Sequence, residues 1–316
     1  MAQREMSTGS AAPNLPAPGS LGAWLRAIRY HSFTASVIPI LVGSALALID
    51  DAFSWPLVIA MLVASVACHA GANMANDYFD DRKGVDNARN LGPHKVIQLG
   101  LLTPDQVRRG MIAAFTLATL VGIYIVLVTD WRVFVLALAS LGAAFFYTAG
   151  SRALGYVALG EVTVFVFMGP AMVCGAYYVL TSSVSWAAFL LSIPAGALSA
   201  ATLHANNMRD IEHDRAAGKT TLATILGREH SSTEYLAWIM AAFASVAVTV
   251  AVDRVLWPVL VVVFTLPNAL RLVRLARTAP DTPSLNRLLR KSAGLHLQFG
   301  GLLTAGLLAR AALDRL

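Results

Sequence analysis

The chain has 316 residues, of which 57% are hydrophobic and only 13% are charged. Soluble domains carry roughly 25% charged residues, so this composition, with a mean hydropathy of +0.63, excludes an ordinary soluble domain and predicts an all-α integral membrane protein. The net charge of +6 comes from basic residues in the loops between apolar segments, which favours a role in membrane topology over nucleic-acid binding. Cys68 and Cys174 lie in apolar segments, and the sequence has neither a disulfide framework nor Cys and His pairs with zinc-ligand spacing.

The chain begins with a segment rich in proline and small polar residues. Residues 1–22 lack the apolar stretch of a secretory signal, and we expect them to form a flexible N-terminal tail. Residues 23–316 are predicted to form a single transmembrane domain. Crossing a hydrocarbon core takes roughly 17–25 apolar residues. Stretches of this kind occupy residues 31–49, 55–79, 105–128, 131–149, 155–180, 185–207, 233–252, 255–272 and 293–313, which predicts nine transmembrane helices.

The distribution of basic residues predicts the orientation of these helices. If the N-terminus is cytoplasmic, 20 of the 24 Lys and Arg residues fall in cytoplasmic segments. The four others are Arg132, Arg254, Arg310 and Arg315. Because basic residues concentrate in cytoplasmic loops, we expect the N-terminus inside and the C-terminus outside.

Two acidic motifs open the long loops after the second and sixth predicted spans. The first motif is NDYFDDRKGVD (residues 76–86), and the second motif is NNMRDIEHDRAAGKTT (residues 206–221). Each follows the second span of a four-span block, which is typical of an internal duplication. The predicted halves are residues 31–150 and 155–272, followed by a ninth helix, 293–313. Two such halves would face each other across a shared cavity.

Both motifs repeat carboxylates and amides at helical spacing. Asn76 and Asp80 are four residues apart, as are Asn206, Asp210 and Asp214, so on a helix each set shares one face. Carboxylate and amide oxygens suit a hard cation such as Mg²⁺. The alternative is that these are solvated charges at helix ends, but their recurrence at equivalent positions favours a cation site. Cations interleave with the acids, as in proteins that hold a diphosphate: Arg82, Lys83, Arg209 and Lys219.

The paired motifs resemble those of the UbiA superfamily of intramembrane prenyltransferases. The forms N-D-Y-x-D-x-x-x-G-x-D and N-N-x-R-D-x-x-x-D-x-x-x-G-K-x-T-L are most similar to its menaquinone branch, the 1,4-dihydroxy-2-naphthoate polyprenyltransferases. The stretches GPHKVIQLGLLTPDQVRRG (92–110) and YTAGSRALGYVALGEVTVFVFMGP (147–170) also resemble that branch. The likeness covers roughly residues 25–310, although Asp81 stands where relatives vary and the spacing of residues 151–156 is not shared by every branch.

This resemblance implies a helical bundle around a central cavity, with a cytoplasmic cap formed by the loops after the second and sixth helices. It implies a Mg²⁺ cofactor held by Asn76, Asp80, Asp86, Asp210 and Asp214. Tyr147 would lie beside the reacting carbon, and the catalytic set would be Asp80, Asp210, Asp214 and Tyr147. The diphosphate would be bound by Lys83, Arg209, Lys219 and Asn206.

Further polar residues inside the spans are candidates for an aromatic-acceptor pocket. Asn73 and His69 precede the first motif by one and two turns, and Glu161 is an acid within the fifth predicted span, where acids are rare. The alternative for each is a structural hydrogen bond between helices. The small residues of IPAGALSAATLHA (193–205) leave space for a prenyl chain or allow close helix packing.

The predicted function is Mg²⁺-dependent transfer of a polyprenyl group from polyprenyl diphosphate to an aromatic acceptor. The motif form favours 1,4-dihydroxy-2-naphthoate, with loss of CO₂ to give demethylmenaquinone. Other acceptors remain open, namely 4-hydroxybenzoate, homogentisate, a haem or a chlorophyll-type ring. A cation-coupled transporter would place its acids near the midplane, and a non-catalytic lipid-binding scaffold has no need of a metal. We expect the active site to face the cytoplasm from a bacterial inner membrane.

Overall fold

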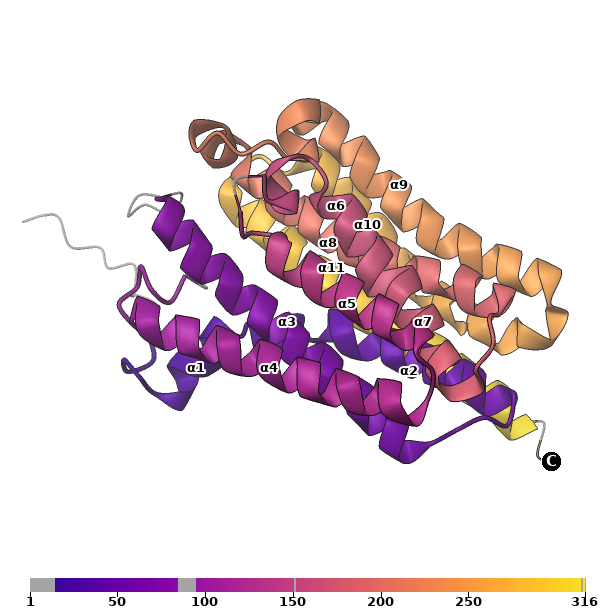
Figure 1. The fold of residues 1–316 in the computed structure, drawn as a ribbon. Coiled ribbons are helices and arrows are strands. Elements are labelled where there is room, and N and C mark those ends of the chain that lie inside the picture. Colours follow the sequence, from indigo (N-terminus) through magenta and orange to yellow (C-terminus); the bar gives the residue numbers. More distant parts are fainter. Residues whose placement is uncertain (1–14, 85–94, 151, 314, 316) are drawn as a thin grey trace, which may run out of the picture.

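The computed structural model describes residues 15–84, 95–150, 152–313 and 315, and these residues form a helical bundle. The first part of the bundle (Figure 1) comprises α1 (Leu21–Ala27), η1 (Tyr30–Ser32), α2 (Thr34–Ile49), α3 (Trp55–Lys83), α4 (Pro104–Val128) and α5 (Arg132–Phe146). The second part comprises η2 (Leu154–Tyr156), α6 (Gly160–Val166), the π-helix η3 (Phe167–Ala171), α7 (Met172–Thr181), α8 (Trp186–Ala216), α9 (Leu222–Val252), η4 (Arg254–Thr265), α10 (Leu266–Thr278) and α11 (Thr282–Leu313).

Seven helical stretches in the described residues are long and apolar enough to cross a membrane. Two further helices, α5 and α11, cover the remaining predicted spans, 131–149 and 293–313. The prediction of an all-helical membrane protein is therefore confirmed. The count of nine spans and the N-in, C-out orientation remain predictions, although α1 and both acidic motifs lie at one end of the bundle and the C-terminus at the other (Figure 1).

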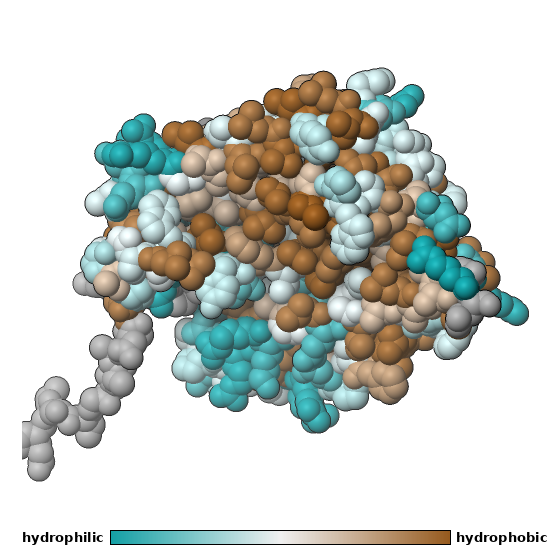
Figure 2. Space-filling view, turned by 90° about the horizontal axis from the view of Figure 1, so that it is seen from below, coloured by the Kyte–Doolittle hydropathy of each residue, from teal (hydrophilic) through white to brown (hydrophobic). Residues whose placement is uncertain are grey.

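The bundle packs in helix pairs and leaves apolar faces exposed. Helix α8 packs along α9, α3 along α4, and α11 contacts α2, α8 and η4. The outer side of α4 is apolar, with Leu120 and Leu127 61% and 79% exposed. Figure 2 shows apolar side chains spread over much of one face, with the hydrophilic ones in separate patches. Exposed apolar surface of this extent is expected where lipid, and not water, is the solvent.

Small residues let α6, η3 and α8 approach closely. A Cβ added to Gly196 would lie 2.4 Å from the carbonyl oxygen of Phe165, and one added to Gly169 would lie 2.8 Å from the Cα of Gly196. Backbone contact of this kind is how small residues stabilise helix pairs in membranes. Residues 193–205 were open to two interpretations, space for a prenyl chain or close helix packing, and at Gly196 the structure shows close packing.

Helices α3 and α8 continue beyond the apolar spans predicted for them and carry both motifs. Helix α3 extends to Lys83 and ends at Gly84, whose positive φ of 66° suits a residue without a Cβ. Helix α8 extends to Ala216, and Gly218 (φ 69°) turns the chain after it. The motif residues up to Lys83 and Ala216 are thus helical, as the four-residue spacing predicts.

A short backbone bridge joins two loops at the motif end of the bundle. Val157 and Thr220 form an isolated parallel β-bridge. The Ala158 N–H donates to the Thr220 carbonyl at 2.9 Å, and the Thr220 N–H donates to the Tyr156 carbonyl at 3.1 Å. The bridge fixes the segment between α5 and α6 against the loop that follows the second motif.

Candidate active site

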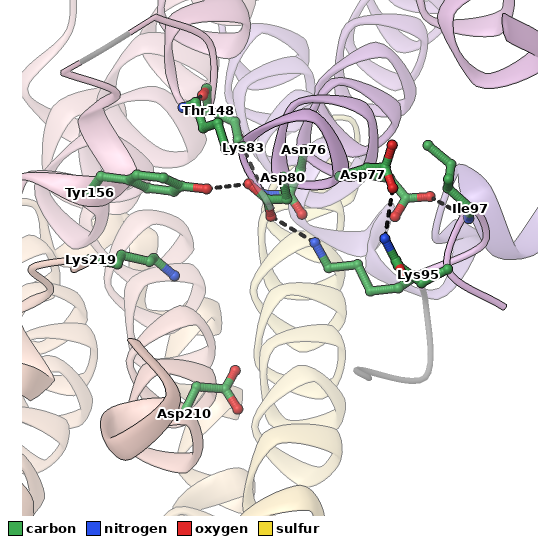
Figure 3. Close-up of polar contacts among 12 residues, drawn as sticks. Asn76, Asp77, Asp80, Lys83, Lys95, Ile97, Thr148, Tyr156, Asp210 and Lys219 are labelled. Carbon is green, nitrogen blue, oxygen red and sulfur yellow. Dashed lines mark hydrogen bonds and ion pairs between the residues drawn. The ribbon is translucent and has the colours of Figure 1, made fainter. Parts of the chain in front are cut away.

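The first motif centres on Asp80, which is buried and has partners from two loops. Its Oδ2 forms a 2.7 Å salt bridge with the Nζ of Lys95, and its Oδ1 accepts a hydrogen bond from the Tyr156 hydroxyl (Figure 3). One turn earlier, Asn76 accepts a 2.6 Å bond from Arg29 and donates to Thr148 at 3.3 Å. Contacts from three separate segments therefore orient the amide and the carboxylate on one face of α3.

Two other acids of the first motif support the loop that carries Lys95. Asp77 accepts hydrogen bonds from the backbone N–H groups of Val96 at 3.1 Å and Ile97 at 3.3 Å. Asp81 accepts a 2.7 Å bond from the Gln98 amide. Because Asp77 fixes the backbone beside Lys95, it positions the cation that pairs with Asp80.

The second motif forms a compact group on α8. Arg209 binds Asp210 in a bidentate manner, at 2.7 and 2.6 Å, and donates to Asn206 at 2.9 Å. It also reaches Asn286 of α11 at 3.1 Å. Asp214 lies one turn beyond Asp210 on α8. Its Oδ1 is 3.3 Å from the Nζ of Lys219, in the loop that follows the helix.

The two motifs converge on Tyr156. The Nζ of Lys83 lies 4.4 Å from the centre of the Tyr156 ring, and the Nζ of Lys219 lies 5.7 Å from it. Lys83 also donates to the Thr148 carbonyl at 2.5 Å. A cation from each motif therefore faces one aromatic ring, whose hydroxyl binds Asp80. Figure 3 shows Asp210 of α8 and Lys219 of the loop after it directed toward the region between α8 and the first motif.

The donor set at this end of the bundle fits Mg²⁺. Asp80, Asp210 and Asp214 would supply carboxylate oxygens and Asn76 an amide oxygen, which are the ligands that Mg²⁺ prefers. Asp214 is 2% exposed, and its Oδ2 is buried without a hydrogen-bond partner among the described residues. A buried carboxylate oxygen of this kind is costly unless a cation binds it. Asp86 lies outside the described residues.

Tyr147 follows α5 and packs against two glycines. A Cβ at Gly155 would lie 3.1 Å from its ring, and a Cβ at Gly160 would lie 3.1 Å from its hydroxyl. The Gly155 N–H also donates to the Tyr147 carbonyl at 3.0 Å. These glycines leave room for the phenol beside the start of α6.

The three residues predicted for the acceptor pocket fall in two separate groups. Asn73 donates to the Ile28 carbonyl at 2.9 Å, and His69 lies 2.7 Å from the Ser36 hydroxyl. Both therefore contact the chain around α1 and α2. Glu161 instead lies against α8, where it contacts His204 and Asn207. Their part in acceptor binding remains a prediction.

Comparison with known proteins agrees with this arrangement. The family model described as "UbiA prenyltransferase family" matches residues 36–291. The chain belongs to the UbiA prenyltransferase family. The protein is therefore a membrane-bound prenyltransferase.

Relatives of this UbiA prenyltransferase match it over nearly their whole length. A 1,4-dihydroxy-2-naphthoate octaprenyltransferase of Mycobacterium leprae is 33% identical, over 92% of this chain and 98% of its own. The Mycobacterium tuberculosis protein of the same name is 35% identical with the same coverage. A structure of a UbiA homolog from Archaeoglobus fulgidus bound to GPP and Mg²⁺ has a TM-score of 0.64 at 16% identity, covering 90% of this chain and 99% of that one. That likeness supports the fold.

Several contact residues of the site were not singled out from the sequence. Tyr156 and Lys95 both lie in stretches that resemble the family, but neither follows the carboxylate spacing by which the motifs were found. Arg29 and Thr148 contact Asn76 from far along the chain. Only the long-range pairing of these segments reveals them, and an isolated sequence contains no direct signal of that pairing.

Proposed function

We propose that the protein transfers a polyprenyl group from polyprenyl diphosphate to 1,4-dihydroxy-2-naphthoate, with Mg²⁺ as cofactor and with loss of CO₂. The observation that carries the proposal is the convergence of Lys83 and Lys219, one from each motif, on Tyr156 beside Asp80. The names of the Mycobacterium relatives support the acceptor. The Archaeoglobus structure, bound to GPP and Mg²⁺, supports a prenyl diphosphate and this metal.

The diphosphate is the leaving group, and both motifs contribute to its binding. Asp80, Asp210 and Asp214, with Asn76, would hold Mg²⁺, which supplies positive charge against the diphosphate oxygens. Lys83, Arg209 and Lys219 neutralise the remaining charge, and Asn206 orients Arg209. Asp86 is assigned to the metal set by its place in the first motif.

Bond breaking precedes or accompanies attack by the ring. The allylic C–O bond breaks heterolytically, and both its electrons leave with the diphosphate. Tyr147 offers an aromatic face to the allylic cation. The acceptor carbon that carries the carboxylate then forms the new C–C bond. The C–CO₂ bond breaks, its electron pair restores the aromatic ring, and the product is the quinol form of demethylmenaquinone.

The membrane location follows from the substrate. Each buried CH₂ contributes about 0.8 kcal/mol, so a polyprenyl chain partitions into the bilayer while its diphosphate stays at the surface. The acidic motifs lie at one end of the bundle, where a diphosphate at the membrane surface would meet them while its polyprenyl chain stays in the bilayer. We assign that end to the cytoplasmic side of a bacterial inner membrane, in line with the loop charges.

The test is prenyl transfer in lipid. Purified protein is incubated with Mg²⁺, a polyprenyl diphosphate and either 1,4-dihydroxy-2-naphthoate or 4-hydroxybenzoate, and prenylated product and CO₂ are measured. We expect naphthoate product with CO₂, abolished in Asp80→Ala and Asp210→Ala. Product from the benzoate alone would overturn the acceptor and keep the mechanism. Absence of diphosphate release with every acceptor would overturn the proposal.

A further inference from the structure

A second group of metal-ligating side chains lies between α6, α8 and α9. The Nδ1 of His204 is 3.1 Å from Oε1 of Glu161 and 3.3 Å from Oε2 of Glu234. One potential ligand atom of each of the three residues lies within 4.8 Å of the others. The side chains of Glu161 and His204 are fully buried. Three helices therefore direct two carboxylates and an imidazole at one point.

Hydrogen bonding fixes which nitrogen of His204 carries its proton. The Nε2 atom lies 3.0 Å from the carbonyl oxygen of Ser231. A carbonyl only accepts, so Nε2 carries the hydrogen. Nδ1 faces the two carboxylates, either as an N–H donor in the imidazolium form or, in the neutral ring, as a lone pair available to a cation between them. A histidine that binds a metal typically donates its other N–H to a backbone carbonyl or a carboxylate in this way.

The two carboxylates have their own outer partners. Asn207 donates to Glu161 Oε1 at 2.8 Å, and the Trp238 indole N–H donates to Glu234 Oε1 at 3.1 Å. In the described part of the chain, Oε2 of Glu161 is buried without a hydrogen-bond partner, and Oε2 of Glu234 is buried with only the 3.3 Å ion-pair contact to His204. Buried charge without a partner is strongly disfavoured. A cation bound between the two carboxylates would compensate their buried charge and accept the lone pair of Nδ1.

We propose that Glu161, His204 and Glu234 bind one divalent transition-metal ion, most suitably Zn²⁺. An imidazole nitrogen with carboxylate oxygens suits zinc, whereas Mg²⁺ prefers oxygen ligands alone. Zinc bonds of about 2.0–2.2 Å place neighbouring ligand atoms of a tetrahedral site about 3.3–3.6 Å apart. The 3.1 and 3.3 Å separations are close to that range. The ion would tie α6 and α9 to α8.

This site is distinct from the motif carboxylates and does not depend on the proposed reaction. At 3.6 residues per turn, Asn206 lies about 200° around α8 from His204, and Asp210 about 240° from it. His204 faces α6 and α9, whereas Asp210 and Asp214 lie roughly 9 and 15 Å further along α8, at 1.5 Å per residue. The assignment also gives Glu161 a role other than acceptor binding.

The experiment measures metal content of the full-length protein in detergent. The protein is stripped with EDTA, reloaded with Zn²⁺ in excess Mg²⁺, dialysed and analysed by elemental mass spectrometry. Glu234→Gln and His204→Gln remove ligands. Asp80→Asn removes a motif carboxylate, and Glu229→Gln is a matched control because Glu229 is exposed on the same helix as Glu234. Visible absorption of Co²⁺-loaded wild-type protein reports the coordination without relying on any variant.

We expect about one Zn²⁺ per chain in the wild type, Glu229→Gln and Asp80→Asn, and at least tenfold weaker retention in the two ligand variants. We also expect the Co²⁺-loaded protein to show tetrahedral bands, and EDTA to lower the melting temperature. Retention by the wild type no greater than by Glu234→Gln would overturn the proposal. So would loss of the zinc in Asp80→Asn, or a melting temperature unaffected by EDTA.

Discussion

The Tyr156 hydroxyl donates a hydrogen bond to Asp80. This contact joins the loop between α5 and α6 to the first acidic motif. The bridge between Val157 and Thr220 in turn holds that loop against the end of the second motif. Tyr156 therefore connects the two acidic motifs of the proposed diphosphate site, and its substitution tests the arrangement directly.

Tyr156→Phe removes the hydroxyl but keeps the ring that Lys83 and Lys219 face. We expect kcat/KM for the polyprenyl diphosphate to fall about tenfold, which corresponds to about 1.4 kcal/mol. Tyr156→Leu should fall further, because each cation–π contact contributes on the order of 0.5–1 kcal/mol. Steady-state transfer in proteoliposomes measures both. Equal activity of Tyr156→Phe and wild type would show that the hydroxyl does not position Asp80.

The Mg²⁺ assignment predicts a difference between adjacent acids. Asp80→Asn and Asp210→Asn should lower kcat by about 10²–10³-fold, the usual cost of losing one group that stabilises developing charge. Asp81→Asn should remain near wild type, because Asp81 accepts a hydrogen bond from Gln98 and is not among the residues assigned to the metal. The Mg²⁺ dependence of product formation measures the effect. A comparable loss of kcat in Asp81→Asn would contradict the assignment of Asp80 and Asp210, and not Asp81, to the metal.

Asp77 is predicted to act through the backbone it holds. Asp77→Ala leaves the N–H groups of Val96 and Ile97 without their acceptor, and an unsatisfied buried donor costs about 1–3 kcal/mol. We expect a lower melting temperature and a higher KM for the diphosphate, since Lys95 is no longer held in place. Asp77→Asn retains one acceptor oxygen and should recover most of the stability. If both variants melt like the wild type, Asp77 does not support this loop.

Gly196 tests the close crossing of α8 with α6 and η3. A Cβ there meets the Phe165 carbonyl at 2.4 Å, and overpacking costs typically 1–3 kcal/mol. Gly196→Ala should therefore lower the melting temperature in detergent. Gly122→Ala is the control, because nothing lies within 4 Å of a Cβ at Gly122. It should be neutral or slightly stabilising, since alanine favours a helix. The reverse order of stabilities would contradict this packing.

The sequence predicted the helical membrane architecture and the two motifs because both depend on local patterns. Apolar length identifies a spanning helix, and the four-residue spacing of Asn76 and Asp80 matches the face they share on α3. The partners of these residues come from elsewhere in the chain. Asp77 holds the backbone next to Lys95, and Thr220 donates a hydrogen bond to the carbonyl of Tyr156. Residue spacing along a single helix predicts neither of these contacts.

Glu161 is a residue that the sequence singles out but whose contacts the sequence does not predict. An acid in an apolar span is a recognisable signal, and the sequence alone predicts a place for Glu161 in an acceptor pocket with Asn73 and His69. Its contacts with His204 and Asn207 depend on how α6 crosses α8. That crossing depends in turn on Gly169 and Gly196, whose proximity becomes visible only once the helices are assembled.

The bridge between Val157 and Thr220 also sets an order of events during synthesis. Thr220 leaves the ribosome 63 residues after Val157, an interval of roughly 3–13 s at about 5–20 residues per second. During that interval the remainder of the fifth predicted apolar segment and the whole sixth one are translated, while the loop bearing Tyr156 lacks its backbone partner. A nascent chain stalled before Thr220 therefore has its first acidic motif but no bridge to hold Tyr156 beside it.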